Sequence, residues 1–366
     1  MKKILTVIRW FTGILFIFSG LVKANDPLGL SYKMQEFFEA WGLTGFHDYT
    51  LMLSVLMNAF EIVAGVAVII GWRMRMFSWL LLLLILFFTF LTGYAMFSGK
   101  IRTCGCFGDC LPLSPWQSFI KDLVLLLFIA LIFYYSKHVK PLFVSGLFNG
   151  ITIAGALVFS FVFQWYVLRY LPVVDCLPFK KGNDLVELRK MPADAIPDRF
   201  EYVFVYQKNG ERKEFPMSAL PDSTWQFVDR IQTLVEKGKN NEPLIKDFDL
   251  KSMSGEDVTE SVLKQPGEYY LLFIKDVQGL SAQDAWVQEL SQIASKHKVV
   301  LVTSQPEAIR ALWNKNSILS NLPVYVCDVT AIKTAARALP TLYKMKGSIV
   351  LDKWSYADFD QIGSKL

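Results

Sequence analysis

Long apolar stretches separated by short polar segments fill the first half of the chain. Five of them are long enough to cross a bilayer, since about 20 helical residues span the ~30 Å of hydrocarbon. They cover residues 4–22, 51–72, 74–97, 116–136 and 142–167. From about residue 171 onward, polar and apolar positions mix as they do in water-soluble domains. The pattern therefore predicts a membrane-embedded α-helical bundle over residues 1–170 and a soluble region after it.

Basic residues mark one side of this bundle. Residues 1–170 contain 13 Lys and Arg but only 7 Asp and Glu, whereas residues 171–366 contain 25 and 26. The loops of one side carry the basic pairs Lys2 and Lys3, Arg73 and Arg75, and Lys137 and Lys140. The positive-inside rule places this side in the cytoplasm. We therefore expect the N-terminus inside, and the loops 24–50 and 98–115 and everything after about residue 170 outside.

The composition excludes several classes of protein. With 53% hydrophobic and 19% charged residues, the chain is neither disordered nor a simple cytosolic protein. Its net charge of +5 is too small for a nucleic-acid surface, so we expect the lipid bilayer and no nucleic acid as a partner. The first apolar stretch has no small-residue cleavage site after it, and we expect it to remain as an anchor.

Ionisable residues inside the predicted helices form a first candidate site. Arg9 and Glu61 each lie about 16–20 Å below the outer ends of their helices, so the two side chains could pair. Lys121 and Asp122 lie within two turns of the outer end of the fourth stretch. A charge deep in a bilayer costs at least a few kcal/mol unless it faces a partner or water. These residues are expected either to be structural ion pairs or to line a polar site that binds a head group or moves protons.

Three of the five cysteines lie in one outer loop, at Cys104, Cys106 and Cys110. The outer compartment permits disulfides, so redox chemistry is the first interpretation. Gly105 and Gly108 allow a tight turn that brings Cys104 or Cys106 to Cys110. A bond across Cys-x-Cys itself closes only with strain.

The surroundings of this loop favour thiolates. The residues Ser114-Pro115-Trp116-Gln117 have the capping-box pattern of a helix start. The dipole of that helix and the cations of Lys100 and Arg102 stabilise a nearby thiolate. Cys176 follows the fifth stretch by about nine residues, and it is also outside.

Three interpretations of the four outer cysteines remain open. They form one or two structural disulfides, a redox-active exchange site with Cys176 as the resolving partner, or a metal site. Four cysteines allow three complete pairings. The metal site is disfavoured, because His47 is the only outer histidine near the bundle and the spacing differs from the paired CxxC of zinc sites. We expect no metal.

Several motifs of the apolar half occur together in a known family. They are Arg9 with Phe18-Ser19-Gly20-Leu21-Val22-Lys23, Glu61 with Gly65 and Gly71, and Cys104-Gly105-Cys106-Phe107-Gly108. In these motifs the chain resembles the DoxX/MauE superfamily of small bacterial membrane proteins, MauE being named for methylamine utilisation. The resemblance implies a four-helix core related to membrane thiol:quinone chemistry and to disulfide maturation of periplasmic partners. The chain lacks the CxxC of quinone-coupled enzymes of the vitamin K epoxide reductase type, and its fifth stretch and long outer region exceed the minimal family.

Residues 171–242 are expected to form a linker and a β-hairpin region. The linker runs from Leu177 to Gly182. The hairpin joins residues 201–206 to 211–217 through Asn209-Gly210, which suits a type I′ turn. A helix is expected to begin near Asp222.

Residues 243–366 alternate strands and helices, which predicts an α/β domain. The strands are expected at 269–274, 299–303, 324–327, 341–345 and 349–354, and the helices at 281–296, 305–315, 330–338 and the C-terminus. This order resembles the thioredoxin/peroxiredoxin fold, with Leu339-Pro340-Thr341 in the place of its cis-proline strand. The active-site segment of that fold corresponds to 275–281, which contains no cysteine, so we expect a binding module without dithiol exchange. Cys327 is expected to be a buried small hydrophobe.

Two functions of different classes fit these observations. The first is a membrane thiol-disulfide oxidoreductase of the bacterial inner membrane, linked to quinone, whose loop cysteines exchange with a periplasmic protein client. The second is a non-catalytic scaffold or assembly factor whose redox-inactive thioredoxin-like domain binds an envelope partner. Transport of a small solute along a path lined by Glu61 is a third interpretation. The client, the electron acceptor and the cysteine pairing stay open.

Overall fold

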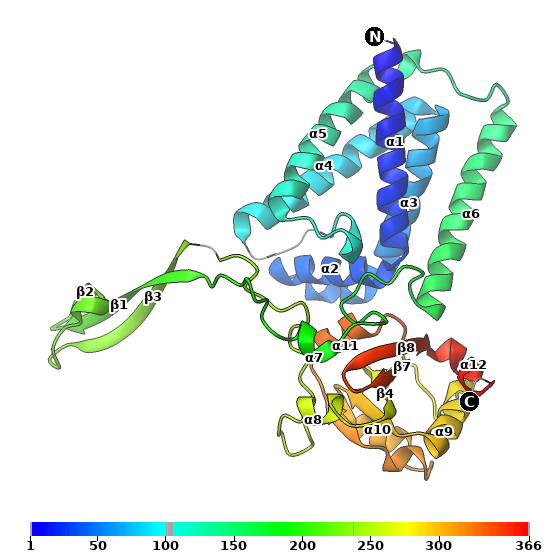
Figure 1. Cartoon of the computed structure of the whole chain (residues 1–366). Coiled ribbons are helices and arrows are strands. Elements are labelled where there is room, and N and C mark those ends of the chain that lie inside the picture. The colour runs from blue at the N-terminus through cyan, green and yellow to red at the C-terminus, as the bar shows by residue number, and fades with distance from the viewer. Residues whose placement is uncertain (1, 100, 102–104, 237, 365–366) are drawn as a thin grey trace.

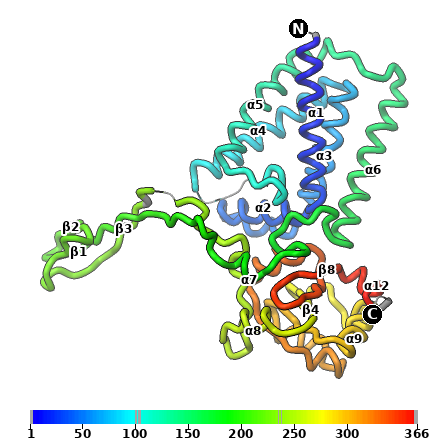
Figure 2. Tube along the Cα trace, in the orientation of Figure 1, coloured from blue at the N-terminus to red at the C-terminus, as the bar shows by residue number. Residues whose placement is uncertain are grey.

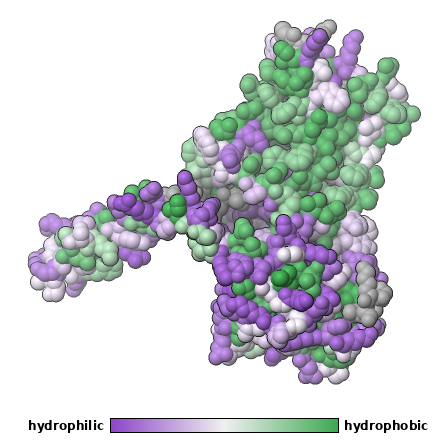
Figure 3. Space-filling model, viewed as in Figure 1, coloured by the Kyte–Doolittle hydropathy of each residue, from purple (hydrophilic) through white to green (hydrophobic). Residues whose placement is uncertain are grey.

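The computed structural model describes residues 2–99, 101, 105–236 and 238–364. Five of its helices are long and apolar enough to cross a membrane: α1 (Lys2–Ala24), α3 (Thr50–Ile70), α4 (Met74–Ser98), α5 (Pro115–Tyr134) and α6 (Gly146–Tyr170). Figure 1 shows these helices at one end of the molecule and an α/β domain at the other. Apolar side chains cover the outside of the bundle, while the domain is largely polar (Figure 3). The predicted transmembrane helices are confirmed, and a lipid bilayer is their environment.

Four of these helices share one buried core, and the fifth stands beside it. Helices α1, α3, α4 and α5 contribute apolar side chains to a common cluster, against which α6 places only partly buried residues. Helices α1 and α3 approach closely because small residues face each other: a Cβ added to Gly65 would lie 2.7 Å from the carbonyl oxygen of Gly13. Gln164 of α6 bonds to Asn58 of α3 at 3.1 Å. The bundle is therefore a four-helix core with one added helix.

The predicted outer loop 24–50 contains a helix that sequence reasoning missed. Helix α2 (Pro27–Ala40) begins with Pro27 at its first turn, and the Asp26 carboxylate accepts a hydrogen bond from the Gly29 amide at 2.9 Å. The 3-10 helix η1 (Thr44–Tyr49) then leads into α3. Phe37 of α2 packs with Ala95 and Ile101, so α2 closes the end of the bundle that adjoins the α/β domain. We call this end the junction end.

The cysteine loop, residues 105–114, also lies at the junction end. Gly105 and Gly108 have φ angles of 72° and 56°, and the Gly108 amide donates to the Gly105 carbonyl at 3.0 Å. The 3-10 helix η2 (Gly108–Cys110) follows. Ser114 and Gln117 form the predicted capping box, since each side chain accepts a hydrogen bond from the other residue's amide. This cap fixes the loop to the start of α5.

The C-terminal region is a mixed α/β domain with helices on both faces of a five-stranded sheet. The strand order is β6 (Val324–Val326), β5 (Val299–Thr303), β4 (Glu268–Ile274), β7 (Thr341–Lys346) and β8 (Ile349–Ser355). Strands β4, β5 and β6 are parallel, and β7 and β8 are antiparallel to their neighbours. One face packs on α9 (Ala285–Lys296), α10 (Pro306–Leu312) and α12 (Phe359–Ser364). The other packs on α7 (Leu185–Leu188), α8 (Thr259–Leu263) and α11 (Val329–Ala335).

The expected linker is part of this domain. Phe179 is 1% exposed and lies in the same buried cluster as Tyr269 and Tyr343 of the sheet. The Gly182 amide donates to the Val350 carbonyl at 2.8 Å. The apolar residues of this segment are therefore core residues, and the α/β domain begins soon after α6.

A three-stranded sheet projects from the domain as an arm (Figure 2). Strands β1 (Arg199–Lys208) and β2 (Glu211–Pro216) form the predicted hairpin, with Asn209 and Gly210 at φ 51° and 87°. The helix expected near Asp222 is wrong, because β3 (Gln226–Glu236) pairs with β1. The Asp222 side chain accepts from the Thr224 amide at 2.9 Å, so a residue that resembled a helix cap forms a turn instead.

Candidate functional site

A buried ion pair joins α1 to α3 near the junction end. Lys23, in the last turn of α1, pairs with the carboxylate of Glu61, and Ser19 Oγ donates to the second carboxylate oxygen at 3.0 Å. Lys23 is 2% exposed and Glu61 is fully buried. The helices touch here because Gly20 has no side chain: a Cβ would lie 2.7 Å from Ile62 Cγ1. The two charges compensate each other in a place where one alone would cost several kcal/mol.

Lys121 and Asp122 of α5 face this pair across a small polar cavity. Asp122 accepts a hydrogen bond from Lys121 Nζ at 2.5 Å and another from Thr92 Oγ1 at 3.1 Å. Both ion pairs line the cavity together with Cys106. Its volume of about 20 Å³ is room for about one water molecule. The bundle therefore gathers Glu61, Lys121 and Asp122 at one place.

Arg9 does not join this cluster, contrary to its predicted pairing with Glu61. Its guanidinium lies at the opposite end of α3, where a Cβ on Gly71 would be 3.1 Å from Nη1. Within the described chain its Nε has no hydrogen-bond partner. Ten residues separate Gly71 from Glu61, or about 15 Å of helix. Arg9 and Glu61 would lie at the same depth only if the outer ends of α1 and α3 were at the same height. In the structure Gly20, close to the end of α1, lies opposite Ile62, so α3 extends beyond the end of α1.

Cys106 lies between the polar cavity and a larger apolar pocket. Ser19 Oγ is 3.1 Å from the Cys106 carbonyl oxygen, so the hydroxyl that contacts Glu61 also holds the cysteine loop. The apolar pocket has a volume of about 200 Å³ and is lined by α2, α3 and α4, mostly through aromatic and aliphatic side chains. Lys23 and Cys106 line both spaces. Lys23 Nζ lies 5.0 Å from the centre of the Phe88 ring, at their boundary.

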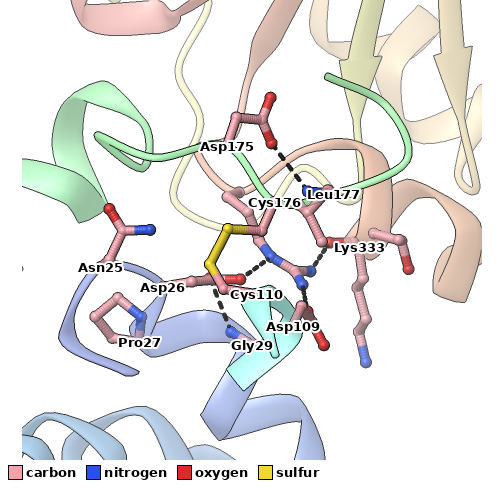
Figure 4. A network of polar contacts seen from close by, with 12 residues as sticks. Asn25, Asp26, Pro27, Gly29, Asp109, Cys110, Asp175, Cys176, Leu177 and Lys333 are labelled. Carbon is pink, nitrogen blue, oxygen red and sulfur yellow. Dashed lines mark hydrogen bonds and ion pairs between the residues drawn. A yellow bond between two sulfur atoms is a disulfide. The ribbon is translucent and has the colours of Figure 1, made fainter. Parts of the chain in front are cut away.

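Cys110 and Cys176 form a disulfide with a Cα–Cα distance of 4.8 Å. The bond ties the cysteine loop to the chain that leaves α6 and enters the α/β domain (Figure 4). Cys104 lies outside the described residues. In the described part of the chain, no group of three or more His, Cys, Asp or Glu residues is arranged to hold a metal ion.

A buried arginine beside the disulfide fastens the α/β domain to the bundle. Arg337, which follows α11, donates from Nε to Asp26 at 2.7 Å and from Nη2 to Asp109 at 2.8 Å. Arg337 is 6% exposed, and its two carboxylates raise its pKa despite the burial. Both carboxylates pair with the same guanidinium, and Figure 4 shows Asp26 and Asp109 next to the Cys110–Cys176 bond. We call Arg337, Asp26 and Asp109 the arginine clamp.

Further contacts surround the arginine clamp. The ring of Tyr32 lies 5.4 Å from the Arg337 guanidinium, and burial raises the pKa of Tyr32 to about 12. Asn25 exchanges two hydrogen bonds with the backbone of Val174, at 2.8 and 3.0 Å. Lys353 pairs with Asp175, and burial lowers the pKa of this lysine. The two parts of the chain are thus joined by polar contacts as well as by a covalent bond.

Sequence reasoning missed most of these contacts. Lys23 and Ser19 were visible only within the motif 18–23, because Lys23 follows an apolar run and resembles an ordinary helix-end lysine. No pattern in the sequence indicated the contacts of Arg337, because its partners Asp26 and Asp109 lie 311 and 228 residues away in the sequence. The capping pattern Asp26-Pro27 was a usable sign of α2.

Cys327 is 3% exposed in the core of the α/β domain, and burial raises its pKa to about 12. Its thiol therefore stays protonated at pH 8, and we expect a maleimide to modify it at least about 100-fold more slowly in the folded protein than in denaturant. An unfolded cysteine has a pKa of about 8.5. The buried neutral thiol therefore contributes its full stabilisation of the folded state below that pH, and this stabilisation is lost as the pH rises toward 12. Mass spectrometry of labelled peptides measures the rate. Equal rates in both states would contradict the burial.

Two family models match parts of the chain. Residues 1–135, which contain α1 to α5 and the cysteine loop, match the family described as Methylamine utilisation protein MauE. Residues 200–237, which form most of the arm, match a model described as Domain of unknown function (DUF8463). No curated protein and no solved structure matched the chain. Residues 1–135 are therefore similar to MauE, and α6 and the α/β domain lie beyond that match.

Proposed function

We propose that the protein is a thiol-disulfide oxidoreductase of the bacterial inner membrane, which oxidises a periplasmic protein client and passes the electrons to a quinone. The single observation that carries this proposal is the position of Cys106, which lines both the polar cavity and the apolar pocket. The N-terminus lies inside and the α/β domain in the periplasm, as the basic loops Arg73–Arg75 and Lys137–Lys140 favour.

The apolar pocket has the properties that a quinone ring requires. It has a volume of about 200 Å³ and walls of aromatic side chains, among them Phe37, Trp41 and Phe88. Lys23 lies at the edge of this pocket, where its ammonium group can donate a hydrogen bond to a carbonyl oxygen. A quinone bound there supplies a two-electron, two-proton acceptor. Lys23 would orient the ring, and the ion pair with Glu61 would hold the Lys23 side chain in place.

The loop cysteines supply the thiols. Because Cys110 and Cys176 are bonded to each other, Cys104 and Cys106 are the other two outer cysteines. A disulfide across a single residue is strained, and strained disulfides are the more oxidising ones. Such a bond would oxidise a client readily, and it would need a strong acceptor such as a quinone to form again. Lys121, which is paired with Asp122, lies 5.2 Å from the Phe107 ring, next to Cys106.

The α/β domain would bind the client without reacting with it. Its strand order, β6-β5-β4-β7-β8, supports a thioredoxin-like fold. The segment between β4 and α9 has no cysteine, so the family's dithiol chemistry is not available there.

A scaffold or assembly factor is the second candidate function. The observation that favours it is the fastening of the α/β domain to the bundle by the arginine clamp and the disulfide. In this alternative the cysteines serve only to hold the two parts together.

Thiol trapping in native membranes tests the proposal. A mass-tagged maleimide is added before and after incubation with oxidised or reduced quinone, and the labelled cysteines are identified by peptide mapping. We expect labelling of the cysteine loop to fall with oxidised quinone and to rise with reduced quinone. Cys106→Ser should abolish this response without changing the amount of protein in the membrane, and Cys327→Ser is the matched control. If labelling does not change with the quinone, the result favours the scaffold. The same holds if Cys106→Ser lowers the amount of protein in the membrane as much as it lowers the response.

A further inference from the structure

A polar groove separates the bundle from the α/β domain beside the disulfide. Its volume is about 440 Å³. Helix α2 forms one wall, with Lys33 and Glu36, and α11 and the residues after it form the other, with Lys333 and Thr334. Cys176 lines this groove, and Cys110 is not among its lining residues. Cys176, which is partly buried, therefore borders a space large enough for several side chains.

We propose that this groove receives an extended, cysteine-containing segment of the client, and that the client thiolate attacks Cys176 Sγ rather than Cys110 Sγ. The inference rests on the proposed function and names the place where the client reacts. Thiol-disulfide exchange depends strongly on which sulfur can be reached, and Cys176 is the residue of this disulfide that lines the groove.

The groove is lined by three cations and three carboxylates, namely Lys33, Lys333, Arg337, Glu36, Glu39 and Asp109. Lys33 is paired with Glu36 at 2.9 Å, and Arg337 is paired with Asp26 and Asp109. Lys333 donates instead to the neutral amide oxygen of Gln35 at 3.2 Å. Burial lowers the pKa of Lys333, and the nearby cation of Lys275 lowers it further. Lys333 is thus the groove cation that can attract an incoming thiolate.

The exchange is balanced in two steps. The first client thiolate forms a bond to Cys176 Sγ, the Cys110–Cys176 bond breaks, and the electron pair leaves on Cys110 Sγ. The second client thiolate attacks the client sulfur of this mixed disulfide and releases Cys176 as a thiolate. The client gains a disulfide, and Cys110 and Cys176 gain two electrons. These two electrons, with two protons, then pass by way of Cys104 and Cys106 to the quinone of the proposed function, and the Cys110–Cys176 bond forms again.

The geometry also explains why the two cysteines belong to different parts of the chain. Cys110 ends η2 in the cysteine loop, while Cys176 begins the α/β domain. A client bound to the domain meets Cys176, and the leaving Cys110 stays next to the bundle.

The test uses the full chain in lipid vesicles, with Cys104, Cys106 and Cys327 replaced by serine so that the Cys110–Cys176 disulfide stands alone. Reduced glutathione is the probe, and mixed disulfides are trapped with acid and located by peptide mapping. We expect glutathione on Cys176 at least about tenfold more often than on Cys110. Thr334→Trp, which fills the groove, should slow the reaction about tenfold, whereas Gln292→Trp on the exposed face of α9 should not.

Equal modification of the two cysteines, a preference for Cys110, or no adduct at all would overturn the inference. An unchanged rate in Thr334→Trp would overturn it as well. This variant lacks Cys104 and Cys106 and no quinone is added, so its failure is separate from the quinone response of the wild-type cysteine loop.

Discussion

Replacement of Arg337 by methionine should release the α/β domain from the bundle. The substitution removes one buried cation and leaves two carboxylates, Asp26 and Asp109, without their partner. Breaking a buried ion pair costs about 3–5 kcal/mol, and we expect the lower end because Asp109 is 38% exposed. The disulfide still tethers the two parts, so the loss should appear as local opening rather than separation. Amide exchange of Val174, which is bonded to Asn25, and protease cleavage near residues 171–177 measure it.

Three further variants make this prediction specific. Arg310→Met removes an exposed arginine of α10 in the same domain and should change neither measurement. Arg337→Lys keeps the charge but cannot hold two carboxylates in a fork, so it should recover only part of the loss. Asp26→Asn combined with Arg337→Met should cost less than the sum of the single changes. If Arg337→Met resembles Arg310→Met, the arginine clamp does not hold the domain.

Loss of the Lys23–Glu61 pair should have the second large effect, and it separates a structural pair from a functional one. Glu61→Leu alone leaves the Lys23 ammonium group buried between α1 and α3, at a cost of about 3–5 kcal/mol. We therefore expect this variant to lose thermal stability and abundance in the membrane. The double variant Lys23→Met with Glu61→Leu leaves no unpaired charge and should regain most of that stability. Thermal unfolding in detergent and quantitative immunoblotting measure the two effects.

The functional outcome of the double variant decides the role of the pair. If Lys23 orients a quinone, the double variant should be stable but should lose the quinone response of the cysteine loop. A stable variant with the full response would show that the pair is structural only. Glu61→Gln provides a milder comparison, because it keeps the size of the side chain. If solute transport were the activity, Glu61→Gln would impair it more than any cysteine substitution.

The ionisable residues of the membrane helices show most clearly where prediction and structure differ. Hydropathy correctly located the five candidate membrane helices of the described residues, because the length and composition of a span are properties of one segment. The same reasoning paired Arg9 with Glu61 wrongly, because the relative height of two helices depends on how their surfaces fit. Gly13, Gly20 and Gly65 set that fit, and they bring Lys23 level with Glu61 instead.

In the C-terminal region, too, features of a single segment were predicted and contacts between segments were not. The alternation of strands and helices was predicted closely, and the Asn209-Gly210 turn formed as expected, because turn geometry is local. Asp222 was misread as a helix cap, since the same side-chain hydrogen bond begins both helices and turns. The pairing of β3 with β1 decided between them.

The sequence by itself determined the five apolar helices, the α/β alternation, the hairpin turn and the position of three cysteines in one loop. These features follow from the composition and periodicity of single segments, which hold wherever a segment is placed. Only the tertiary structure decided that Lys23 meets Glu61, that Cys110 is bonded to Cys176, and that Arg337 holds two distant carboxylates. Contacts of this kind depend on which surfaces pack together, and a charged or sulfur-containing side chain is compatible with many partners until the packing brings one of them within reach.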